Sequence, residues 1–173
     1  MTEQQLLQTS RFSIVELPAL ADSPQGPKRQ VIRHPGAVVI IPMVDSEHVC
    51  LIRNYRVSVD RTLTELPAGT REPGEAAEVT ALRELTEETG YRAESLRRIS
   101  QFLPSPGILD EIMILYLAEG LSEGPPAREA GEQIENLVVP WQQAMAMVMA
   151  GEIEDAKTII GLLLVDRQRS SDG

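Results

Sequence analysis

The segment that decides the fold runs from Gly69 to Tyr91 and reads GTREPGEAAEVTALRELTEETGY. Its first six residues include two glycines and a proline, which predict a loop because glycine permits unusual backbone angles and proline fixes its own. Residues 75–89 contain neither glycine nor proline and are rich in helix formers, so they predict a helix. Gly90 then stands where a glycine commonly ends a helix. The segment therefore predicts a loop, a helix and a stop.

The carboxylates of this expected helix indicate a metal site. Glu84 and Glu88 are four residues apart with Glu87 beside them, a spacing that makes them neighbours on a helix surface. Like charges at this spacing destabilise a helix by about 0.2–0.5 kcal/mol per pair. A divalent cation would reverse that cost, since Mg²⁺ is usually held by one or two carboxylates plus substrate phosphates. We expect Arg83 to pair with one of these carboxylates and Glu75 to support the loop. For any single glutamate, the alternative is a solvated residue on an exposed face.

The whole segment resembles the Nudix box, Gly-x5-Glu-x7-Arg-Glu-aliphatic-x-Glu-Glu-x-Gly-aliphatic, and every fixed position matches. Only the last position departs, where Tyr91 replaces an aliphatic residue. The resemblance implies that Glu84 and Glu88 bind metal, and that Glu87 binds it or acts as a base. It also implies that the carbonyl of Ala68 is a further ligand. The implied ion is Mg²⁺, with Mn²⁺ as an alternative and more than one ion per site.

Motifs outside the box resemble the ADP-ribose pyrophosphatase branch of the same family. They lie between residues 28 and 167 and are Asn54-Tyr55-Arg56, Glu65-Leu66-Pro67-Ala68-Gly69, Pro104-Ser105-Pro106-Gly107, Asp110-Glu111 and Gly151-Glu152-Ile153-Glu154-Asp155-Ala156. Pro106 falls sixteen residues after Gly90, where that branch has a proline. The resemblance implies that Arg56, Pro106, Glu111 and Arg29 contact substrate. A surface arginine at a strand end fits the pattern of Arg56 equally well.

The branch also implies a catalytic glutamate from the loop before the last strand. Glu132, just before Gln133 and Ile134, fits this role best, and Glu129 is the other candidate. Some relatives have an acidic residue where this chain has Ala130, so the identity of the base stays open between the two.

Composition limits the kind of protein this can be. A chain of 173 residues with 42% hydrophobic and 24% charged residues is typical of one globular domain. The formal net charge of −10 argues against nucleic-acid or anionic-membrane partners, but not against a small phosphorylated substrate. The single Cys50 cannot form an internal disulfide, and no apolar run approaches the ~20 residues that span a bilayer. We expect a cytoplasmic protein.

Runs of apolar and β-branched residues predict the strands, which we place at residues 11–17, 28–33, 37–41, 48–55, 62–66, 93–102, 111–118 and 134–139. The third and fourth of these are expected to pair as a hairpin across the turn Asp45–Glu47. Pro140 is expected as the first residue of a helix that ends at Gly151, and Asp155 as the N-cap of a helix over 156–167. Strands and helices without regular alternation predict an α+β fold with a mixed sheet sandwiched by helices.

The first two strands predict an N-terminal antiparallel hairpin within residues 1–35, followed by a Nudix-like domain over 36–173. An isolated hairpin is marginally stable in water, so it must pack against the main domain or a second copy of the chain. In the branch that this sequence resembles, the hairpin exchanges between two protomers. We therefore expect a homodimer.

The resemblance implies Mg²⁺-dependent hydrolysis of a nucleoside diphosphate derivative, with ADP-ribose giving AMP and ribose 5-phosphate. The alternatives are GDP-mannose or another nucleotide sugar, then a dinucleotide such as NADH or diadenosine polyphosphate, then an oxidised nucleoside triphosphate. A non-catalytic ADP-ribose sensor is a further alternative, although such domains usually lose box carboxylates that are all present in this chain. A plain structural domain would leave the box unexplained.

Overall fold

The structure is a computed structural model that describes residues 3–19, 22–23, 25–127 and 134–171. Its strands are β1 (Gln4–Gln8), β2 (Ser13–Leu17), β3 (Arg29–Arg33), β4 (Ala37–Pro42), β5 (His48–Arg56), β6 (Arg61–Glu65), β7 (Ala68–Thr70), β8 (Ser95–Phe102), β9 (Met113–Glu119) and β10 (Ile134–Pro140). Its helices are α1 (Ala77–Thr89), α2 (Trp141–Met149) and α3 (Ala156–Arg169). The expected α+β class is confirmed, and no helix in the described part of the chain is long and apolar enough to cross a membrane.

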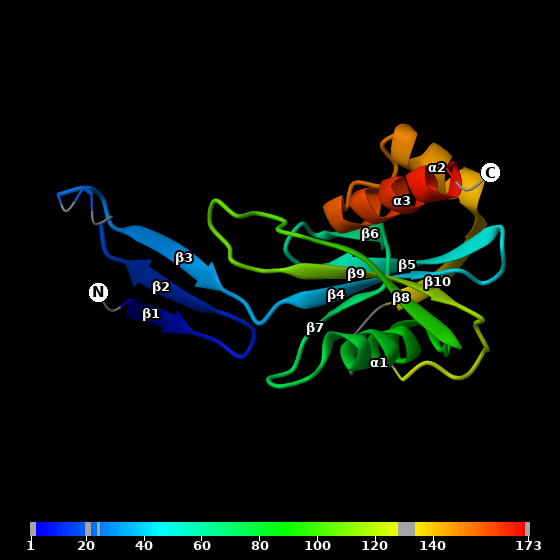
Figure 1. Ribbon diagram of the computed structural model, residues 1–173, viewed down its shortest axis with the longest axis horizontal. Helices are drawn as coiled ribbons and strands as arrows, with labels where there is room; N and C mark the ends of the chain where they lie inside the picture. The colour runs from blue at the N-terminus through cyan, green and yellow to red at the C-terminus, as the bar shows by residue number, and fades with distance from the viewer. Residues whose placement is uncertain (1–2, 20–21, 24, 128–133, 172–173) are drawn as a thin grey trace.

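The N-terminal strands form a separate antiparallel sheet in the order β1-β2-β3, which projects from the rest of the molecule (Figure 1). The predicted hairpin is confirmed as β2 and β3, but β1 was missed because its five residues are exposed and show no alternation. The sheet is tied to the body through β3, where the Ile32 amide donates to the Ile108 carbonyl at 2.8 Å. Arg33 also pairs with Asp110 at 2.9 Å.

Two further sheets, β7-β4-β9-β8 and β10-β5-β6, make up the body. Strand β4 is parallel to β9 and antiparallel to β7, so the predicted mixed sheet is confirmed. The predicted hairpin of β4 with β5 is wrong, because these strands lie in different sheets and share only the bridge between Met43 and Val49. A strand has two edges, and those of β4 are occupied by β7 and β9.

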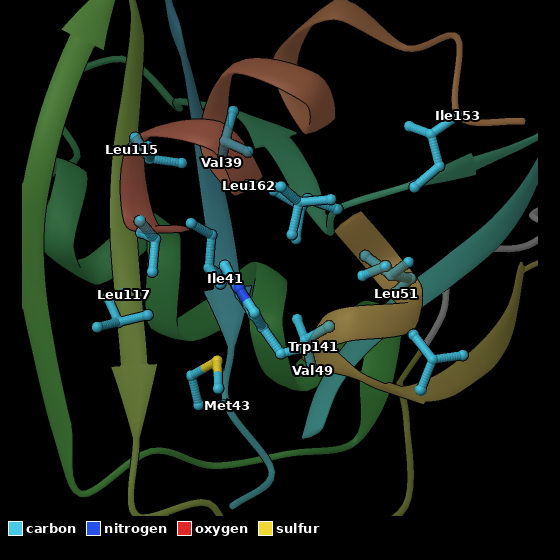
Figure 2. Close-up of a cluster of buried hydrophobic side chains, with 14 residues drawn as sticks. Val39, Ile41, Met43, Val49, Leu51, Leu115, Leu117, Trp141, Ile153 and Leu162 are labelled. Atoms are coloured by element: carbon cyan, nitrogen blue, oxygen red, sulfur yellow. The ribbon is translucent and has the colours of Figure 1, made fainter. Parts of the chain in front are cut away.

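Strand β4 separates two hydrophobic clusters. Val39 and Ile41 point toward α2 and α3, where Figure 2 shows them near Leu162 and Trp141. Val38 and Ile40 point the other way, into a cluster with residues of α1 that includes Tyr91 in the last box position. Side chains alternate across a strand, so this apolar run is buried on both faces. As a result, α1 lies on one side of the body, and α2 and α3 on the other (Figure 1).

The ends of the helices lie within a few residues of the positions predicted from the sequence. Helix α1 begins two residues later than expected and ends at Gly90, which has φ 81° and donates its amide to Thr86 at 2.9 Å. Asp155 caps α3 by accepting from the Thr158 amide at 3.0 Å, as predicted. Pro140 precedes the first residue of α2 rather than occupying it, and α3 continues to Arg169.

Candidate active site

Arg83, in the middle of α1, binds three carboxylates, one from the loop before the helix and two from the helix itself. Its guanidinium donates to both oxygens of Glu75 at 3.1 Å, to Glu84 Oε1 at 2.8 Å and to Glu87 Oε2 at 2.9 Å. The sequence predicted one such pair, and the structure has three. Glu75 also accepts from the Glu72 amide at 3.2 Å and the Thr80 hydroxyl at 2.9 Å, which confirms that it supports the loop.

This arrangement predicts a dependence of stability on pH. The hydrogen bonds from Arg83 lower the pKa of Glu75 from 4.5 to about 2. A carboxyl whose pKa is lower in the folded state stabilises the fold above its ordinary pKa, and that contribution is lost as the pH falls from about 4.5 to about 2. We therefore expect Glu75→Gln to lower the melting temperature at pH 6 but to have a smaller effect at pH 3.

Thermal unfolding between pH 3 and pH 6 measures this difference. The matched control is Glu72→Gln, which changes an exposed glutamate of the same loop and should leave the pH dependence unchanged. If the melting temperatures of the wild type and Glu75→Gln changed in parallel with pH, the lowered pKa of Glu75 would be refuted as a source of stability.

The other box carboxylates lie against the backbone of β7. Glu88 is 5% exposed, and its Oε2 accepts from the Ala68 amide at 2.9 Å. A Cβ placed on Gly69 would lie 1.8 to 2.2 Å from the carboxylate atoms of Glu84. Only a glycine therefore allows the strand and the Glu84 carboxylate to approach this closely. The two carboxylates of the predicted metal site meet at the Ala68–Gly69 backbone.

A cavity of about 420 Å³ opens beside the same strand. It is lined by the end of β5 and the tip of the β5–β6 hairpin, by β7, by the first residues of α3, and by Glu111 and Met113. Ala68 and Gly69 thus line the cavity and also contact the carboxylates of α1. A molecule in this cavity would lie next to the predicted metal site.

Two cations and one buried carboxylate form part of the cavity wall. Arg56 donates to Glu65 through Nε at 2.7 Å and Nη2 at 2.6 Å, and Lys157 binds the same Glu65 through Nζ. Burial opposes the ionisation of Glu65, but the hydrogen bonds from Arg56 and the charge of Lys157 outweigh it and lower the Glu65 pKa. Of these three residues, only Arg56 was predicted from the sequence to contact substrate, although Glu65 and Lys157 lie in or beside the motifs that resemble the ADP-ribose pyrophosphatase branch.

Glu111 also lines the cavity and is only 9% exposed. Its burial raises the pKa of the carboxyl above the ordinary value. His34 lies 3.1 Å away through Nδ1, which also accepts from the Gly36 amide at 3.2 Å. Glu111 therefore faces the cavity, and its contact with substrate stays a prediction.

Comparison with known proteins matches residues 33–160 to the NUDIX domain. The chain belongs to the Nudix family. It is 42% identical over 146 residues to an ADP-ribose pyrophosphatase of Bacillus subtilis (strain 168), an alignment that covers 83% of this chain and 77% of the relative. It is 37% identical over 158 residues to a methanol dehydrogenase activator of Bacillus methanolicus, covering 90% and 83%.

Among solved structures, the Nudix fold of this chain matches a crystal structure of an ADP compounds hydrolase. The TM-score is 0.81, with coverage of 100% of this chain and 94% of the other. Sequence identity is 24%, so this likeness supports the fold alone.

Nudix proteins typically use a divalent metal ion, and the residues of this chain fit one. In the described ranges, no three His, Cys, Asp or Glu side chains are arranged to hold a metal by themselves. Arg83 binds two of the box carboxylates, Glu84 and Glu87, at 2.8 and 2.9 Å. Two carboxylates plus substrate phosphates suffice for Mg²⁺, and the close approach of Glu84 and Glu88 to β7 supplies such a pair.

The remaining residues predicted for the Nudix site are only partly brought together. Arg56, Glu111 and Ala68 line the cavity, but Pro106 and Arg29 do not. Arg29 lies in β3 of the projecting sheet, and Pro106 lies in the loop before β9. Glu129 and Glu132 lie outside the described residues, so their catalytic role stays a prediction.

Proposed function

We propose that this chain hydrolyses the pyrophosphate of ADP-ribose to AMP and ribose 5-phosphate in a metal-dependent reaction. The observation that carries the proposal is the double role of β7, whose Ala68–Gly69 backbone lines the cavity and contacts Glu84 and Glu88. The similarity to the Bacillus subtilis ADP-ribose pyrophosphatase supports the choice of substrate. A pyrophosphate in this cavity would lie beside the carboxylates.

Different residues of the site bind the metal and the substrate in this proposal. Glu84, Glu88 and the Ala68 carbonyl would hold the metal, with Glu87 as a further ligand or a supporting base, and Arg56 binds a substrate phosphate through its guanidinium. Mg²⁺, or Mn²⁺ in its place and with more than one ion per site, would neutralise charge on the phosphoryl oxygens and would make a water more acidic when bound.

Two further roles complete the site. Arg83 fixes the orientation of the Glu84 and Glu87 carboxylates through its hydrogen bonds. The proton of the attacking water goes to Glu132, with Glu129 as the other candidate, or to Glu87 in the role of supporting base. Glu111, which also lines the cavity, contacts the substrate.

A substrate panel tests the proposal. Purified protein with Mg²⁺ is incubated in parallel with ADP-ribose, GDP-mannose, NADH and dGTP, and the products are separated by chromatography. We expect ADP-ribose to be cleaved fastest, with AMP and ribose 5-phosphate in equal amounts. Faster cleavage of GDP-mannose would support the metal site but would identify GDP-mannose, rather than ADP-ribose, as the preferred substrate. Binding of ADP-ribose without cleavage of any of the four would favour a sensor.

We also propose that residues 1–35 form a unit that pairs with a second copy of the chain, giving a homodimer. All five residues of β1 are exposed, and Leu6 and Leu7 are 49% and 48% exposed. An exposed strand edge with apolar side chains is a template for pairing with another chain. Sedimentation at micromolar concentration should give twice the chain mass, and Leu7→Glu should give a monomer. A monomeric wild type would refute the dimer.

A further inference from the structure

Glu65 is a buried carboxylate shared by two cations on the cavity wall. It is 1% exposed and forms a two-point hydrogen bond with Arg56 at 2.7 and 2.6 Å. Lys157 is also buried, at 7% exposed, and its Nζ binds Glu65 Oε2. All three residues line the cavity. One negative charge therefore faces two positive charges, and the trio carries a net charge of +1.

Asp155 adds a second negative charge beside Lys157, so the four side chains together carry no formal net charge. Its Oδ2 lies 3.0 Å from Lys157 Nζ, but the same oxygen accepts from the Thr158 amide at 3.0 Å and the Thr158 hydroxyl at 2.5 Å. Its charge is thus shared with the N-terminus of α3, where the helix dipole is positive. Lys157 therefore keeps this wall from being net negative, because without it Arg56 would face the charges of Glu65 and Asp155, with that of Glu88 acting on it as well.

Without Lys157, the balance of charge around Arg56 would change. A two-point pair of Arg56 with Glu65 alone is neutral as a whole, and a carboxylate that already satisfies the guanidinium competes with any phosphate for it. With Lys157 present, part of the Glu65 charge is directed to the ammonium. The guanidinium of Arg56 then attracts a phosphate while Glu65 still fixes its orientation.

We propose that Lys157 is a positioning residue that offsets the charge of Glu65 and thereby keeps Arg56 attractive to a substrate phosphate. The inference rests on the proposed function for the identity of the substrate, but it applies to any diphosphate in the cavity. The competing explanation is structural: Lys157 only satisfies a buried carboxylate, since removing one partner of a buried ion pair leaves an unpaired charge. The two explanations differ in what a second substitution at Glu65 does.

The test uses Lys157→Met, Glu65→Gln and the double variant Glu65→Gln/Lys157→Met in the full chain. Binding of ADP-ribose and of inorganic pyrophosphate is measured by calorimetry in EDTA, so the readout does not require the metal-loaded enzyme. We expect Lys157→Met to weaken both ligands by roughly tenfold, the order expected for the loss of one charge interaction near a protein surface. The double variant should recover most of this loss, because the carboxylate that neutralised Arg56 is gone.

Steady-state kinetics adds a second readout. Lys157→Met should raise KM for ADP-ribose more than it lowers kcat, and Lys157→Arg should behave like the wild type because it keeps the charge. The matched control is Lys28→Met, which removes the same charge from an exposed ion pair with Glu16 in the N-terminal sheet. It should leave pyrophosphate binding unchanged.

Several outcomes would overturn the proposal. The proposal is wrong if the double variant binds as weakly as Lys157→Met. It is also wrong if Lys157→Met binds as tightly as the wild type. If Lys157→Met does not fold, Glu65→Gln decides, because its amide oxygen can still accept from Arg56 and orient it while the competing charge is gone. Our proposal therefore expects this variant to bind pyrophosphate at least as tightly as the wild type. Weaker binding by Glu65→Gln would then favour the structural explanation. Failure of the wild type to cleave ADP-ribose would refute the substrate, whereas the pyrophosphate measurements would still test Lys157.

Discussion

Replacing Glu88 with glutamine will lower the turnover of ADP-ribose by at least about 100-fold while the fold is retained. A catalytic metal contributes several kcal/mol of charge stabilisation, and each 1.36 kcal/mol corresponds to about a factor of ten in rate. The amide oxygen of glutamine can still accept from the Ala68 amide, which Glu88 does at 2.9 Å. The substitution therefore removes the charge that a metal needs and keeps the contact that holds α1 against β7.

The measurement is kcat at saturating Mg²⁺, together with the melting temperature. Glu78→Gln is the matched control, because Glu78 lies on the same helix and accepts from the Tyr116 hydroxyl at 2.9 Å, away from the cavity. It should retain wild-type turnover. Activity of Glu88→Gln within about threefold of the wild type would remove Glu88 from the metal site.

The parts of the fold that local chemistry determines were predictable from the sequence. Gly90 ends α1 with φ 81°, and Asp155 caps α3, because each effect depends on a few adjacent residues. The pairing of strands depends instead on the whole chain. The strand β4 was given the wrong partner because its pattern shows that it is buried but not which strands occupy its edges. Strand β1 was missed because an exposed strand has no apolar pattern.

The candidate site shows the same division. The carboxylates of α1 were predictable because their spacing on one helix brings them together. The pairing of Glu65 with Lys157 was not, because these residues are 92 positions apart and opposite charges in a sequence do not indicate burial. The resemblance to the Nudix family pointed to Arg56 and Glu111, and both residues line the cavity. It did not indicate which residue orients the guanidinium of Arg56.

Gly69 lines the cavity and, because it has no side chain, also allows the Glu84 carboxylate of the metal site to approach β7. We expect Gly69→Ala to lower turnover of ADP-ribose by about 100-fold, since displacing a catalytic group by about 1 Å can cost that much. The new Cβ would lie 1.8 to 2.2 Å from the Glu84 carboxylate, which must move away. The fold should survive, because the atoms displaced are the end of a flexible side chain. The melting temperature and kcat measure the two effects separately.

A double-mutant cycle with Glu84→Ala distinguishes this mechanism from damage to β7 itself. Once the Glu84 side chain is removed, the methyl group at position 69 has no carboxylate to displace. Gly69→Ala should then cost little further activity in the Glu84→Ala background, so the two losses will not add. An equal loss in both backgrounds would mean that the methyl group acts through the backbone of β7 or through the cavity. In that case the loss caused by Gly69→Ala would not come from displacement of the Glu84 carboxylate.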